Sequence, residues 1–178
     1  IVEEQLRLCA HVGIKVIHCG VLSDHAQLDA LKAMGERFGI ELRIAVHREE
    51  LWHFERLTLD AVHDYAVANP THAVCYFHTK GVSAPQDDSK LVWRRAMMRE
   101  VVARWERNLD SCATHDLVGM AWQQDPNHPH FSGNFWWARC DWIASIGSCT
   151  AHRDSRPDFP WMGQSWKSRF FAESWMGS

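Results

Sequence analysis

Short apolar runs alternate along this chain with longer amphipathic segments, and this alternation limits the folds that the chain can adopt. Runs of β-branched and other apolar residues predict strands, while apolar positions at helical spacing predict helices. The predicted strands cover 14–19, 41–46, 73–77, 117–122 and 134–138. The predicted helices cover 2–11, a segment after Ser23 or Asp24, 53–68, about 90–109 and 141–146, and the tail from 148 is expected to be irregular. Strands separated by helices predict an α/β fold, a three-layer α/β/α sandwich with a mostly parallel sheet.

Size and charge exclude several classes of protein. With 178 residues, 46% of them hydrophobic, the chain is predicted to form a single domain over 1–178. A formal net charge of −3 gives no basic surface for nucleic acid, so we expect no nucleic-acid partner. The sequence has no apolar run long enough for a transmembrane segment and no signal-peptide pattern, so we expect a cytoplasmic protein, or one peripheral to a membrane.

Tryptophan is concentrated in the C-terminal third of the chain, where the segment His130–Ala138 has the sequence HFSGNFWWA. In an extended segment neighbouring side chains point to opposite faces, so Trp136 and Trp137 cannot both lie in one core. Glycine allows close approach to the backbone, and Asn134 offers donors and an acceptor. These features predict a ligand-facing strand edge; the alternative is a core strand whose second tryptophan is covered by a helix.

A second unusual segment, His78-Thr79-Lys80-Gly81, follows the predicted strand 73–77. Ligands of α/β sheets bind beyond the carboxyl ends of strands, and a lysine, a histidine and a hydroxyl group suit a diphosphate there. Arg94, in the next predicted helix, would add donors for an anion. The alternative is a lysine at the end of a strand that only reaches solvent.

Cysteine and histidine give weaker indications of chemistry. The six cysteines show no metal-binding spacing, and we expect reduced thiols in the core. His128 and His130 could present two imidazoles to a metal, and with Asp125 they would define a metal hydrolase, the third and least supported class of function.

Five blocks of the sequence together resemble a known family: YFHTKGVS, WRRAMM, LVGMAW, HFSGNFWWA and FFAESW. Over residues 50–178 they are similar to glycosyltransferase-like proteins of GT-A (Rossmann-like) fold, related to proteins of rhamnan and other surface-polysaccharide synthesis. The resemblance implies a single GT-A-like domain, here without its first nucleotide-binding strand. It also implies transfer of a sugar from a nucleotide-sugar donor to a glycan acceptor.

The resemblance assigns roles to individual residues. His78 and Lys80 would neutralise charge on the phosphates of the donor and so act in catalysis. Thr79, Gly81 and Arg94, which the residue types themselves place in the donor site, would bind the donor beside them. Glu173 would be the general base of an inverting transfer, with Asp154 or Asp158 next in line. The acceptor would be bound by His130, Ser132, Gly133, Asn134, Trp136 and Trp137.

The cofactor requirement departs from the family's pattern. Many such enzymes hold Mn²⁺ or Mg²⁺ with an Asp-x-Asp motif, whereas this chain has His-Thr-Lys at that place and Asp87-Asp88 further on. No metal ligand is therefore predicted, and no cofactor is firmly implied, although Mn²⁺ or Mg²⁺ stays open. The competing class of function is a non-catalytic carbohydrate-binding domain with a tryptophan-rich cleft.

Overall fold

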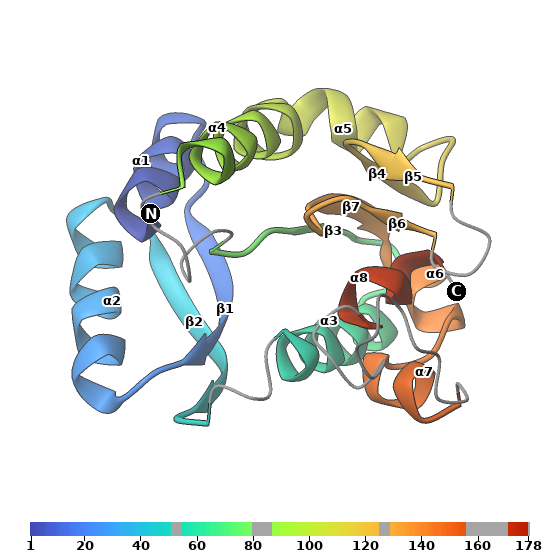
Figure 1. Ribbon diagram of the computed structural model, residues 1–178, viewed down its shortest axis with the longest axis horizontal. Coiled ribbons are helices and arrows are strands. Elements are labelled where there is room, and N and C mark those ends of the chain that lie inside the picture. The colour runs from blue at the N-terminus through green and yellow to red at the C-terminus, as the bar shows by residue number, and fades with distance from the viewer. Residues whose placement is uncertain (51–54, 80–86, 125–128, 156–170, 178) are drawn as a thin grey trace. The chain divides into compact units, whose positions relative to one another are not determined.

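The computed structural model describes residues 1–50, 55–79, 87–124, 129–155 and 171–177 (Figure 1). The chain divides into two compact units, residues 1–58 and 59–178. That the whole chain is one domain stays a prediction. Along the parts of the chain that the structure describes, no helix has both the length and the apolar character needed to cross a bilayer.

The N-terminal unit is built around two parallel strands joined by a helix. Its elements are α1 (Val2–His11), β1 (Val16–Leu22), α2 (His25–Arg37) and β2 (Glu41–Arg48). The sheet begins with Val16 opposite Glu41. The Asp24 side chain caps α2 by accepting a hydrogen bond from the Gln27 amide at 2.8 Å, so Asp24 is the cap of the two candidates, Ser23 and Asp24. Helix α2 lies close to β2, because a Cβ on Gly35 would lie 2.7 Å from Cγ of Leu42.

The described residues of the C-terminal unit form two small antiparallel sheets. In the first, β7 (Trp136–Arg139) lies between β3 (Ala73–Tyr76) and β4 (Leu117–Gly119) and is antiparallel to both. In the second, β5 (Trp122–Gln123) pairs with β6 (His130–Phe131). The predicted strand 117–122 is thus two strands, separated at Ala121, whose φ of +57° is in the left-handed region.

The prediction of a three-layer, mostly parallel GT-A-like (Rossmann-like) sandwich is wrong. Among the described residues the only parallel pair is β1 with β2, and the remaining strand pairs are antiparallel. Periodicity located the other strands but missed β6, and it did not predict the order of the strands in the sheets. After β4 the chain reverses direction through the antiparallel β5–β6 pair, so β7 is antiparallel to both β3 and β4.

The predicted helix 90–109 is interrupted by a π-helical segment. It forms α4 (Asp88–Met97), the π-helix η2 (Met98–Ala103) and α5 (Trp105–Ser111). The wider turn of a π-helix leaves carbonyl groups for other donors. The buried side chain of Asn108 donates from Nδ2 to the carbonyls of Glu100 at 2.8 Å and Val101 at 3.0 Å, which stabilises the irregular turn.

Helices surround the core of the C-terminal unit. They are α3 (Arg56–Ala68), α6 (Cys140–Ser145), α7 (Cys149–Ser155), α8 (Phe171–Ser174) and the 3₁₀ turn η3 (Trp175–Gly177). The tail therefore contains more regular structure than the sequence predicts. Asp60 on α3 fixes the start of α7, because its carboxylate accepts from the Thr150 amide at 2.9 Å and from the Thr150 hydroxyl. The core includes Leu59, Tyr76, Phe131, Trp136, Ile143, Trp175 and Met176.

Candidate functional site

The two segments that the sequence singles out meet at one end of the β3–β7–β4 sheet. His78 lies just beyond β3, and its Nε2 atom is 2.9 Å from the carbonyl oxygen of Gly133, 55 residues further on. A carbonyl only accepts, so Nε2 must carry the proton in this hydrogen bond. The His78 ring also lies edge-on to Phe135, with ring centroids 5.2 Å apart. His78 therefore joins the end of β3 to the turn that leads into β7.

The other residues predicted to bind the donor differ in how exposed they are to solvent. Thr79 is exposed, whereas Arg94, on α4, is only 5% exposed. Lys80 and Gly81, which the sequence also assigns to the donor site, lie outside the described residues. Of the predicted donor-binding residues, the structure thus brings His78 against the Ser-Gly-Asn turn and leaves Thr79 accessible beside it.

The turn at Ser132-Gly133-Asn134 depends on left-handed backbone conformations. Gly133 has φ of +91° and Asn134 has φ of +57°, and the Asn134 amide donates to the Phe131 carbonyl at 2.9 Å. A Cβ on residue 133 would lie 2.5 Å from Sδ of Met97 and 3.1 Å from Nε1 of Trp93. Glycine is required at position 133 because side chains of α4 pack closely against its backbone. The sequence alone suggests instead that a ligand approaches the backbone there.

Asn134 and Trp136 are buried and bonded to each other. Oδ1 of Asn134 accepts a hydrogen bond from Nε1 of Trp136 at 2.8 Å, and the indole is fully buried. The Trp136 ring stacks on Tyr76 at 5.0 Å and meets Trp175 edge-on at 6.4 Å. These two side chains therefore position the turn and the strand, and neither presents a free face to a sugar in this conformation.

Trp137 lies on the other face of β7, as alternation along a strand requires. Its Nε1 donates to the carbonyl of Val101 at 2.8 Å, in the π-helical segment η2. The second tryptophan is thus covered by a helix and half-buried, which is the alternative that the sequence left open. The sequence contained no pattern that predicted a π-helix here, or that its Val101 carbonyl would accept the hydrogen bond from this indole.

The side chains of Glu173 and His130 lie close together and are both partly buried. Nε2 of His130 in β6 is 4.0 Å from Oε2 of Glu173 in α8, and the two side chains are 12% and 14% exposed. Helix α8 is held firmly, because the next residue, Trp175, is buried and its Nε1 donates to the Gly147 carbonyl at 2.9 Å. A side chain at Gly177 would collide with the Pro129 carbonyl, so η3 lies directly against the segment before β6. Glu173 is therefore a positioned carboxylate in this short helix.

The structure describes only some of the alternative general bases and predicted metal ligands. Asp154 pairs with its neighbour Arg153 at 2.7 Å, whereas Asp125, His128 and Asp158 lie outside the described residues. Asp87 caps α4, and the hydrogen bond from Ser89 is the main cause that lowers its pKa. In the described part of the chain no three His, Cys, Asp or Glu residues lie together as metal ligands would, so we derive no chemical step through a metal.

All six cysteines are free thiols. Burial raises the pKa of Cys9 to about 12 and that of Cys19 to about 11, so both are protonated near neutral pH. Two of the others, Cys140 and Cys149, belong to the core of the C-terminal unit. Cys9 and Cys19 are therefore poor nucleophiles in the folded protein.

These features define an α/β protein with short mixed sheets and an aromatic-rich C-terminal unit. The chain belongs to the family described as "Domain of unknown function (DUF8361)", which matches residues 1–178. No curated protein and no solved structure matches the chain. The resemblance to glycosyltransferase-like proteins is not tested by this match and stays a hypothesis.

Proposed function

We propose that this protein transfers a sugar from a nucleotide-sugar donor to a glycan acceptor. The observation that carries the proposal is the contact between His78 and Gly133, which brings the residue just beyond the end of β3 next to the Ser-Gly-Asn turn. Segments that are distant in the sequence and rich in polar groups, and that converge at one sheet end, are typical of ligand sites. The support comes from this convergence and from the sequence resemblance, and not from the fold.

On the donor side, the proposal uses Thr79 and Lys80. A lysine ammonium would neutralise the charge that builds up on the diphosphate as it leaves. His78 would have a positioning role, because its Nε2–H already donates a hydrogen bond to the Gly133 carbonyl. It would keep the donor segment in place against the acceptor segment. Arg94 is buried and is not needed for donor contact.

On the acceptor side, Glu173 is the proposed general base. The acceptor hydroxyl oxygen attacks the anomeric carbon, the bond from that carbon to the diphosphate oxygen breaks, and the hydroxyl proton moves to the Glu173 carboxylate. His130 lies close enough to orient that carboxylate. Ser132, which is half-buried, is the remaining acceptor contact in this proposal, because the Trp137 indole is covered by η2 on the other face of β7.

The test combines donor binding with turnover. A panel of sugar nucleotides is titrated by calorimetry with and without Mn²⁺, and release of nucleoside diphosphate is then followed with glycan acceptors. Lys80→Ala should weaken donor binding. Glu173→Gln should preserve binding and lower the rate by at least 100-fold, whereas the exposed control Glu106→Gln should leave the rate unchanged.

Two results would overturn the proposal. One is a wild-type chain that binds no sugar nucleotide in either condition; if it still binds glycan, it is a non-catalytic carbohydrate-binding domain. The other is a Glu173→Gln variant that turns over at the wild-type rate.

A further inference from the structure

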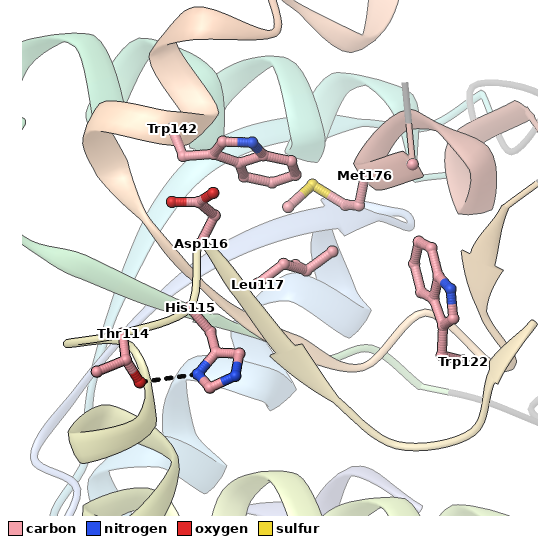
Figure 2. A pocket seen from close by; sticks show the side chains of 8 residues that line it. Thr114, His115, Asp116, Leu117, Trp122, Trp142 and Met176 are labelled. Carbon is pink, nitrogen blue, oxygen red and sulfur yellow. Dashed lines mark hydrogen bonds between the residues drawn. The ribbon is translucent and has the colours of Figure 1, made fainter. Parts of the chain in front are cut away.

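A groove on the C-terminal unit is lined by residues other than those assigned to transfer. It is shallow and open to solvent, with a volume of about 450 Å³. Figure 2 shows its lining, which combines aromatic and aliphatic side chains with a polar rim. The lining residues are Thr114, His115, Asp116, Leu117, Trp122, Trp142, Met176 and Gly177.

Two tryptophans form the aromatic part of the groove. Trp122, on β5, is 42% exposed and is held edge-on against Phe131, with ring centroids 5.0 Å apart. Trp142, on α6, is half-buried against the core. In Figure 2 the side chains of Met176 and Leu117 lie between the two indoles. The groove therefore has an apolar floor with an indole on either side.

The polar rim follows the end of α5 and leads into β4. His115 is oriented by its Nδ1 atom, which is 2.9 Å from Oγ1 of Thr114 and 3.2 Å from the carbonyl of Ser111. The bond to a carbonyl places the proton on Nδ1, so Nε2 of the neutral ring is an acceptor. Asp116, whose Oδ1 is 3.4 Å from Nη1 of Arg139, adds carboxylate oxygens. The rim thus presents acceptors that suit hydroxyl donors.

We propose that this groove binds a saccharide chain without negative charge. A sugar ring has C–H groups on its face, which pack on the negative face of an indole, and hydroxyls on its edge, which would bond to His115 and Asp116. The Asp116 carboxylate repels a phosphate or other anion, and the Arg139 guanidinium 3.4 Å away offsets only part of that repulsion. A purely apolar ligand is disfavoured as well, because it would cover polar rim groups without bonding to them. This inference concerns binding only and does not depend on sugar transfer.

The test uses chitohexaose, cellohexaose and maltohexaose as probes for the whole chain, with inorganic phosphate as the charged comparison. Isothermal calorimetry should detect binding of at least one hexasaccharide and none of phosphate. Trp122→Ala should raise its Kd about tenfold or more, because it removes the exposed aromatic face. Leu109→Ala is the matched control: Leu109 is 41% exposed on α5, outside the lining, and its loss should change Kd less than twofold.

The proposal is overturned if no hexasaccharide binds, if phosphate binds more tightly, or if folded Trp122→Ala keeps the wild-type Kd. Should Trp122→Ala fail to fold, Asp116→Asn decides, with a rise in Kd of at least threefold expected and an unchanged Kd contradicting the proposal. Failure here is distinct from failure of sugar transfer. Glu173→Gln should keep full hexasaccharide affinity, and Trp122→Ala should keep its affinity for sugar nucleotides.

Discussion

Replacement of Asn134 by alanine separates a structural role from a ligand-binding role for this residue. The substitution removes the side-chain oxygen that accepts the hydrogen bond from the buried Trp136 indole N–H. It also places alanine at φ of +57°, where asparagine is tolerated because its side chain can hydrogen-bond locally. An unsatisfied buried donor costs about 1–3 kcal/mol, and alanine in the left-handed region costs about 1 kcal/mol. We expect Asn134→Ala to lower the free energy of unfolding by about 2–4 kcal/mol.

Urea unfolding, with the free energy extrapolated linearly to water, measures this loss. Asn134→Gly should lose about 1 kcal/mol less than Asn134→Ala, because glycine accepts the positive φ. In a Trp136→Phe background, which has no indole N–H, Asn134→Ala should cost only the backbone part, about 1 kcal/mol. A loss below about 0.5 kcal/mol in the wild-type background, or equal losses in both backgrounds, would refute the reasoning.

Two further predictions concern the remaining unusual positions. Gly133→Ala should lower the melting temperature more than Gly147→Ala, because both have positive φ but only residue 133 would crowd Met97; equal shifts in thermal unfolding would contradict this. Burial raises the pKa values of Cys9 and Cys19 above the ordinary value near 9, so the unfolded state ionises first as the pH rises. The free energy of unfolding should therefore fall between pH 9 and 11, and a double Cys→Ala variant should lose most of that dependence if the thiols cause it.

Local chemistry explains the parts that the sequence predicts well. The Asp24 cap, the strand at β2 and the opposite orientation of Trp136 and Trp137 follow from a capping side chain and from alternation along a strand. These rules act over a few residues, so the sequence contains all that they need.

Other features required contacts between distant segments. The sequence could not show that Asn134 would turn inward to Trp136, or that Gly133 would meet α4 instead of a ligand. No pattern in the sequence predicted the π-helix, in which the Val101 carbonyl accepts a hydrogen bond from Nε1 of Trp137. Each of these contacts depends on which side chain a distant helix or strand places at that position. Secondary-structure propensity, which is a local property, does not specify this.

The sequence by itself determined where most strands and helices form, which residues carry polar chemistry, and that adjacent tryptophans face opposite ways, because these follow from local backbone geometry. Only the tertiary structure decided that β7 runs antiparallel between β3 and β4, that His78 meets Gly133, and that Glu173 lies beside His130. Strand order and such pairings are fixed by packing between segments far apart in the chain, where hydrogen bonding and burial are optimised for the whole unit.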